Sequence, residues 1–250
     1  MSAALLSLAG VQTHIGTYHI LHGVDLEVRS GCVTMLLGRN GAGKTTCLRT
    51  IMQHWRRSGG SVHFEGVDLA ELRPSEVARL GIAYVPENMG IFGGLTVREN
   101  LLLAARSARN DAQIDRDRLN RIFEQFPALE RFWQSPAGSL SGGQKQMLAI
   151  ARALIEPRRL LLIDEPSKGL APAIVETLIA ALDRARREGT TILLVEQNLE
   201  VARRLGDFYA VMDNGRIVHQ GAMSALVSDP ELQTRLLGFT LGNDDGPTKH

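Results

Sequence analysis

The sequence predicts an α/β fold in which helices cover a mainly parallel sheet. Short apolar runs alternate with longer amphipathic segments, which is the pattern of strands joined by helices. One apolar run, Val33–Leu37, is followed at once by a glycine-rich loop and then by helical spacing. The 250 residues, 44% of them hydrophobic, suffice for one large domain with a buried core, which we expect to span residues 1–237.

The individual core elements follow from their apolar content and their length. After the glycine-rich loop, Lys44–Trp55 has the spacing of a helix. Four further short runs are predicted as strands, and the last three of them are rich in apolar residues, as buried strands are. These predicted strands are Ser61–Glu65, Ile82–Val85, Leu160–Ile163 and Thr191–Val195.

The middle of the chain departs from this alternation. Leu119, Ile122, Phe123 and Phe126 recur at helical spacing, with charged residues between them. We therefore expect a helical insertion over about 96–155. Its charges are those of a solvated helix face rather than of a binding patch.

Two features mark the C-terminal part. The apolar runs Phe208–Met212 and Arg216–Gln220 flank Asn214-Gly215, and Asn-Gly between such runs predicts a hairpin with a type I′ turn. The polar tail, residues 238–250, is expected to be flexible.

Composition excludes several classes of function. Lys and Arg total 28 against 27 Asp and Glu, so the net charge gives no reason to bind nucleic acid or an anionic membrane. Cys32 and Cys47 form no metal-binding spacing. The N-terminus lacks a signal-peptide pattern, and no run approaches the roughly 18 apolar residues of a membrane span. We expect any membrane role to depend on a partner.

The glycine-rich loop fits the phosphate-binding pattern G-x-x-x-x-G-K-[ST]. Its glycines let backbone N–H groups surround phosphate oxygens at the start of a helix, where the dipole favours anions. The lysine would reach the β- and γ-phosphates of a nucleoside triphosphate, and the threonine hydroxyl would hold Mg²⁺. Taken alone, the motif suits a GTPase, a kinase or a recombinase equally well. The loop comprises Gly38, Arg39, Asn40, Gly41, Ala42, Gly43, Lys44 and Thr45.

An acid pair ends the Leu160–Ile163 strand. We expect this strand beside Val33–Leu37, so that Asp164 meets the Mg²⁺ ion directly or through water. Glu165 would then lie near the attacking water, as the candidate general base or water-positioning residue.

A second glycine turn precedes the helical run Lys145–Ile155. Ser141 is a plausible N-cap, and Gly142, Gly143 and Gln144 follow it. The turn is either a plain capped helix start or a second anion site.

The order and spacing of GRNGAGKTT, LSGGQ and LLLIDEP resemble the nucleotide-binding subunits of ABC transporters. The resemblance implies a P-loop NTPase core with an antiparallel β edge subdomain and a helical insertion. It extends the phosphate loop to Thr46. It also implies that Ser141–Gln144 contact the γ-phosphate of ATP held by an opposite subunit.

The same resemblance implies partners and a location. A second ABC ATPase subunit, identical or related, completes a head-to-tail pair that encloses two ATPs. Polytopic permease subunits bind this pair at the cytoplasmic side of the inner membrane, and an external solute-binding protein acts through them.

A narrower resemblance is to the ATPases of branched-chain amino acid uptake systems. It rests on Tyr84–Glu87, on Asp164–Ser167 with Gly169–Pro172, and on Leu194–Asn198. Urea and short-chain amide importers have similar ATPases, so the cargo stays open. The alternative function is a soluble ABC-type ATPase acting on nucleic acid or ribosomes, although such proteins usually carry coiled-coil insertions or two motif sets.

The chain departs from the general family pattern at three positions. Glu87 stands where many members have Gln, and we expect it to bind Mg²⁺ or water. Gln197 stands where many have a catalytic His; it can donate a hydrogen bond but cannot become cationic. The residue expected to stack on adenine is Ile15 instead of an aromatic side chain. Tyr18 is a second candidate there, although core packing explains it equally well.

Overall fold

The computed structural model describes residues 4–105 and 114–237. The predicted flexible tail, residues 238–250, lies outside the described residues. Among those that are described, no helix combines the length and the apolarity that a membrane span requires.

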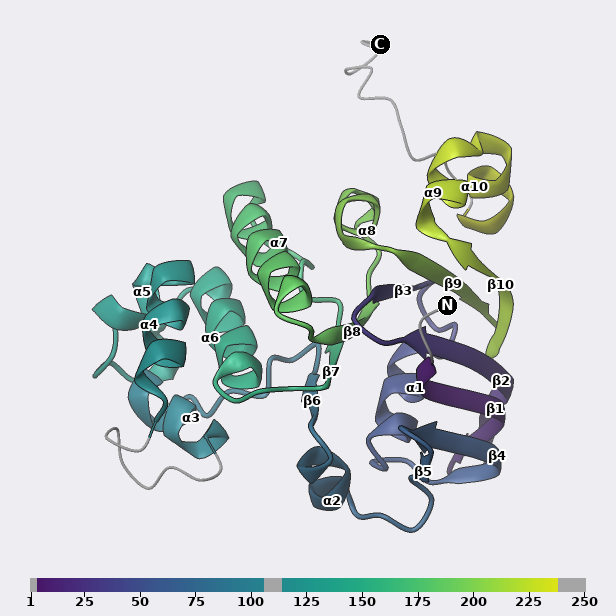
Figure 1. The fold of residues 1–250 in the computed structure, drawn as a ribbon, viewed down its shortest axis with the longest axis horizontal. Coiled ribbons are helices and arrows are strands. Elements are labelled where there is room, and N and C mark those ends of the chain that lie inside the picture. The colour runs from purple at the N-terminus through teal and green to yellow at the C-terminus, as the bar shows by residue number, and fades with distance from the viewer. Residues whose placement is uncertain (1–3, 106–113, 238–250) are drawn as a thin grey trace.

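A mainly parallel sheet forms the core (Figure 1). Within the described residues it has six strands, and only the edge strand β10 is antiparallel to its neighbour. Every residue of β3, β7 and β8 is buried, which agrees with their largely apolar sequence. In sheet order the strands are β10 (Arg216–Ala222), β9 (Phe208–Asp213), β3 (Val33–Leu37), β8 (Thr191–Val195), β7 (Leu160–Asp164) and β6 (Ile82–Val85).

This order corrects one expectation. The acid-bearing strand β7 does not lie beside β3, because β8 is paired with both of them. All three strands are fully buried and mostly apolar, so their composition could not predict their order in the sheet. Since parallel strands end at the same edge, the residues after β7 still reach the loop after β3.

A second, antiparallel sheet covers one side of the core, as the family resemblance implied. Within the described residues it consists of β2 (Tyr18–Arg29), β1 (Ala4–Ile15), β4 (Arg57–Phe64) and β5 (Val67–Asp68), in that order. Helix α1 (Lys44–Ile51) shares an apolar cluster with Leu26 of β2 and Leu162 of β7. The helix was predicted to continue to Trp55, but Gln53 is left-handed, with φ 59°, and ends it early.

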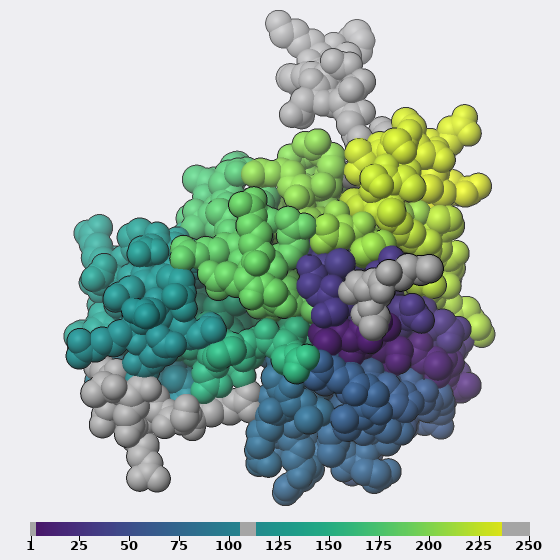
Figure 2. Space-filling model, in the orientation of Figure 1, coloured from purple at the N-terminus to yellow at the C-terminus, as the bar shows by residue number. Residues whose placement is uncertain are grey.

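Helices gather on the opposite side of β6 and β7 from the antiparallel sheet (Figures 1 and 2). Helix α3 starts with a capping box in which Thr96 and Glu99 satisfy each other's backbone N–H groups. These helices fall within the predicted insertion. They are α3 (Val97–Ala104), α4 (Arg116–Gln125), α5 (Pro127–Arg131), the short 3₁₀ turn η2 (Ala137–Ser139) and α6 (Gly142–Leu154).

The remaining elements complete the cover. The hairpin prediction is confirmed, since Asn214 and Gly215 join β9 to β10 with φ values of 44° and 70°, both positive as a type I′ turn requires. The other helices are α2 (Pro74–Arg79), α7 (Pro172–Arg187), α8 (Leu199–Leu205), α9 (Met223–Ser228) and α10 (Pro230–Leu237).

Candidate nucleotide-binding site

The glycine-rich loop joins β3 to α1 in the predicted place. A side chain on Gly38 would collide with the Met212 carbonyl oxygen, and Gly41 and Gly43 have φ values of 83° and 105°. These positions therefore need glycine. Gly43 caps α1, and no side chain of the described residues caps this helix start. The first N–H groups of the helix are thus oriented to meet an anion.

Lys44 is held across this loop. It is only 4% exposed, and its Nζ donates to the carbonyl oxygens of Gly38 at 2.8 Å and Arg39 at 3.0 Å. Burial lowers the pKa of Lys44, while the charges of Glu165 and Asp164 act to raise it. The ammonium group is therefore preorganised at the centre of the loop.

Asp164, the last residue of β7, is 1% exposed, and burial raises its pKa. A hydrogen bond from Thr45 opposes that shift, which places the two predicted metal ligands in contact. The Asp164 Oδ1 atom is buried without a hydrogen-bond partner in the part of the chain that the structure describes. An unpaired buried carboxylate oxygen beside a hydroxyl is a chemically suitable pair of oxygen ligands for Mg²⁺.

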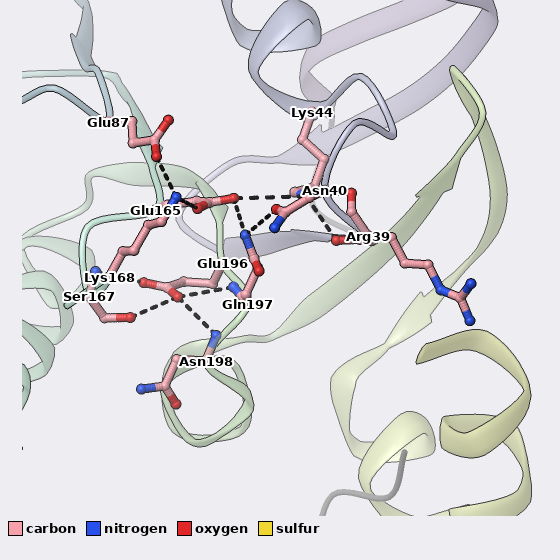
Figure 3. Close-up of polar contacts among 11 residues, drawn as sticks. Arg39, Asn40, Lys44, Glu87, Glu165, Ser167, Lys168, Glu196, Gln197 and Asn198 are labelled. Atoms are coloured by element: carbon pink, nitrogen blue, oxygen red, sulfur yellow. Dashed lines mark hydrogen bonds and ion pairs between the residues drawn. The ribbon is translucent and has the colours of Figure 1, made fainter. Parts of the chain in front are cut away.

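Glu165 lies one residue beyond, with φ 46°. Its Oε1 atom is 3.9 Å from Lys44 Nζ and accepts a 2.5 Å hydrogen bond from Gln197 Nε2 (Figure 3). The same Gln197 amide donates to Asn40 Oδ1 at 2.6 Å. Three loops that follow three different strands therefore meet at one carboxylate.

Glu196 was not among the predicted site residues. It is 2% exposed, and its carboxylate accepts from the backbone N–H groups of Ser167, Gln197 and Asn198 and from the Ser167 hydroxyl, at 2.9–3.1 Å. This side chain clamps the loop after β7 to the loop after β8 (Figure 3). The only signal in the sequence was an acidic residue directly after the apolar run Ile192–Val195.

Lys168 was also missed. Its Nζ atom lies 2.6 Å from Glu87 Oε1 and 3.4 Å from Glu165 Oε2. Hydrogen bonding to Glu87 and the charge of Glu165 raise the pKa of Lys168. Glu87, predicted as a metal ligand, thus pairs with a cation in this structure.

A cavity of about 360 Å³ is lined by Lys44, Glu87, Glu165 and Lys168 among others. Ile20, on β2, forms part of its wall, whereas the described lining includes neither Ile15 nor Tyr18. Those two residues pair at the β1–β2 hairpin, where Tyr18 is 74% exposed. The lining residues are Ile20, Asn40, Gly41, Gly43, Lys44, Thr45, Thr46, Glu87, Glu165 and Lys168. The Arg39 side chain points away from them (Figure 3).

The second glycine turn lies elsewhere. Ser141 caps α6, and none of Ser141, Gly142, Gly143 or Gln144 lines this cavity. Gly143 packs against Ile174 of α7. Helix α6 and helix α1 lie on different sides of β7 and β8 (Figure 1). The structure therefore brings the loop, the acid pair and Gln197 together but leaves the LSGGQ turn apart from them.

Known proteins resemble this chain over nearly its whole length. A family model described as ABC transporter matches residues 21–168. The high-affinity branched-chain amino acid transport ATP-binding protein BraG of Pseudomonas aeruginosa is 41% identical, over 94% of this chain and 100% of that protein. The probable branched-chain amino acid transport ATP-binding protein LivF of Archaeoglobus fulgidus is 35% identical, over 88% and 93%.

A solved structure of an ATP binding subunit of an ABC transporter has the same fold. It aligns with a TM-score of 0.80 at 31% identity, over 94% of this chain and 95% of that one. These findings confirm the resemblance to ABC transporter ATPases, including the branched-chain amino acid group, and the predicted fold class. The chain belongs to the family of ATP-binding, ATP-hydrolysing subunits of ABC transporters.

Proposed function

We propose that this chain hydrolyses MgATP to power an importer for branched-chain amino acids or a related small amino acid or amide. The observation that carries the ATPase mechanism is the meeting of Lys44, Asp164 and Glu165 at the helix start after β3. The cargo rests on the similarity to BraG and LivF.

The phosphates of ATP would lie in the loop Gly38–Thr45, extended by Thr46. The N-terminal N–H groups of α1 face that position, and Lys44 adds a buried cation. Ile20 forms the wall toward the base, with Ile15 and Tyr18 further along the same hairpin. Among the described residues, no aromatic side chain lines the cavity. We therefore expect weak discrimination between adenine and guanine.

Thr45 and Asp164 would hold Mg²⁺. No group of three or more His, Cys, Asp or Glu within residues 4–105 and 114–237 could hold a metal ion by itself. The ion would therefore arrive with the nucleotide and take its remaining ligands from phosphate and water. When bound, it would neutralise charge that develops on the phosphate oxygens.

Glu165 would position and deprotonate the attacking water. The water oxygen bonds to the γ-phosphorus, the bond to the ADP oxygen breaks, and the water proton passes to the Glu165 carboxylate. Gln197 fixes that carboxylate through the hydrogen bond to Oε1. Since an amide cannot titrate, the fixing contact is independent of pH near neutrality.

Two subunits would complete each site. Ser141–Gln144 lie outside the cavity of their own chain, so they can contact a γ-phosphate only across a pair of subunits. The second subunit is either another copy or a related ATPase. ATP binding would close the pair, and hydrolysis would reopen it.

A permease would dock on another cavity, of about 750 Å³, beside β6 and α6. Asn88, Met89 and Phe92 from the segment after Glu87 line it, and Arg49 and Arg152 add cationic groups. Its described lining contains no Asp or Glu. It therefore suits an apolar helical segment with an acidic residue, from a polytopic subunit that holds this chain at the cytoplasmic face of the membrane.

Co-purification tests this function directly. The tagged full chain should be recovered from detergent-solubilised membranes together with polytopic subunits. In the recovered complex, an external binding protein loaded with leucine, isoleucine or valine should stimulate ATP hydrolysis more than the same protein with urea or acetamide. Recovery with nucleic acid or ribosomes and without membrane subunits would contradict the proposal.

A further inference from the structure

One lysine joins two carboxylates that come from different strands. Glu87 follows β6 and Glu165 follows β7, and Lys168 Nζ lies 2.6 Å from the first and 3.4 Å from the second. Figure 3 shows the Lys168 side chain running up between them. Both contacts lie at the wall of the nucleotide cavity.

The local backbone explains how the lysine reaches this position. Glu165 is left-handed, and the Lys168 N–H donates to the Glu165 carbonyl at 3.3 Å, which closes a tight turn. The turn returns the Lys168 side chain over the carboxylate three residues earlier. The side chains of Lys168 and Glu87 are 58% and 48% exposed, so their ion pair adds little to folding.

The charges around the cavity give this pair a role in binding. Glu87, Glu165 and Asp164 provide three acidic groups, which Lys44 opposes together with Arg49 near Asp164. A triphosphate brings further negative charge, and Glu87 stands where many family members have a neutral Gln. Glu87 without a counter-charge would therefore repel the γ-phosphate.

We propose that Lys168 is a positioning residue that neutralises Glu87 and holds Glu165 beside the γ-phosphate. This inference rests on the proposed ATPase site. Lys168 is then required because residue 87 is charged, and the requirement should disappear when Glu87 is replaced by Gln. A lysine with a purely structural role would show no such dependence.

A double-mutant cycle on the purified full chain tests this coupling. The variants are Lys168→Met, Glu87→Gln and the two combined, and the measurement is the Kd of a fluorescent N-methylanthraniloyl ATP with Mg²⁺. Lys168→Met should weaken binding roughly three- to fivefold, as expected for a partly exposed charge. The combined variant should bind within about twofold of Glu87→Gln alone, and Lys168→Arg should bind like the unmodified chain.

Steady-state kinetics of the assembled transporter separate the effect of Lys168 on Glu87 from its effect on Glu165. There, Lys168→Met should raise KM for ATP through Glu87 and lower kcat through Glu165. When Lys168→Met is combined with Glu87→Gln, only the kcat effect should persist. The difference in Kd between Lys168→Met and the unmodified chain should shrink in 0.5 M salt, since exposed charges are screened.

The control is Arg203→Met on α8. It removes an exposed pair with Glu200 that has the same three-residue spacing as Lys168 and Glu165, and it should leave the Kd unchanged. An unchanged Kd in Lys168→Met, or an equal loss with Gln at position 87, would overturn the inference. Failure of the unmodified chain to bind MgATP would instead overturn the proposed function.

Discussion

The starts of helices α1 and α6 both carry glycine-rich turns, but within the described residues only the start of α6 has side chains that accept hydrogen bonds from its backbone N–H groups. At α1, Gly43 offers no capping side chain. At α6, Ser141 Oγ accepts from Gln144 N at 3.4 Å, and Gln144 Oε1 accepts from Ser141 N at 2.9 Å. The first helix start is open to an anion, whereas the capping box of the second already pairs two N–H groups, those of Ser141 and Gln144.

This difference indicates that the two halves of the site act at different steps. The first half-site is the loop Gly38–Thr45, and the second half-site is the turn Ser141–Gln144. The loop Gly38–Thr45 should bind nucleotide in the isolated chain, because its donors have no competing cap. The turn Ser141–Gln144 should add affinity only in a closed pair, where the γ-phosphate held by the other subunit can reach it. Binding and hydrolysis should therefore respond differently to changes in each half.

The largest effect is expected for Glu165→Gln. Loss of the base should lower kcat on the order of 10²–10⁴-fold while MgATP still binds. Unhydrolysed nucleotide should keep the pair closed, which light scattering would detect as a persistent dimer. The control is Glu188→Gln, an exposed acid at the end of α7, which should hydrolyse normally. Hydrolysis by Glu165→Gln at the native rate would remove it from the role of base.

Lys44→Ala should affect the first half-site most. Loss of a charge-assisted contact to phosphate should weaken MgATP binding on the order of 100-fold, measured by calorimetry on the full chain. Lys145→Ala, on the first turn of α6, is the matched change in the second half and should leave this affinity unaltered. Equal losses in the two variants would break the distinction between the half-sites.

Ser141→Ala should do the reverse. ATP binding by the isolated chain should be unchanged, while kcat of the assembled pair falls by roughly tenfold because one donor to the γ-phosphate is lost. The variant also loses a helix cap, which costs about 1 kcal/mol. Thr96→Ala removes the corresponding capping box of α3 and controls for that loss. A tenfold lower kcat in both variants would assign the effect to helix stability.

Glu196→Gln tests whether the first half-site is assembled before nucleotide arrives. An amide cannot accept from all four donors, so the free energy of unfolding at pH 7 should fall by about 1–3 kcal/mol. Burial raises the pKa of Glu196 above its ordinary value of 4.5. Glu196 is therefore protonated more readily in the folded chain than in the unfolded chain. The stability from that protonation is full below pH 4.5 and is lost as pH rises through the folded pKa.

The variant should therefore lose more stability relative to the native chain at pH 4 than at pH 7. Urea unfolding at the two pH values measures this difference. Glu200→Gln, an exposed acid on the neighbouring helix α8, should show little change at either pH. A loss of unfolding free energy in Glu196→Gln that is larger at pH 7 than at pH 4 would contradict the role assigned to Glu196.

Local sequence signals predicted much of the fold and part of the site. The strands β3, β6 and β8 have the predicted bounds, because apolar runs between turn residues mark buried strands. The position of β8 between β3 and β7 is set by tertiary pairing, which no local pattern encodes. The glycine loop and the acid pair could be predicted because their chemistry requires particular residue types at fixed spacing.

The residues that were missed depend on contacts between distant loops. Lys168 follows the acid pair in a segment that resembles the family. Its proposed role depends on its contact with Glu87, which is 81 positions away. Glu196 contacts Ser167 across 29 positions. Ile20 enters the cavity wall on a hairpin whose register is irregular near His14. Spacing along the chain could not reveal these contacts.

The direct test of the whole account is a structure of Glu165→Gln with MgATP, together with its partner subunits. It should contain two subunits in head-to-tail arrangement, with each γ-phosphate in hydrogen-bond range of both Lys44 of one subunit and residues 141–144 of the other. Nucleotide held at Gly38–Thr45 while residues 141–144 stay distant from every γ-phosphate would contradict it.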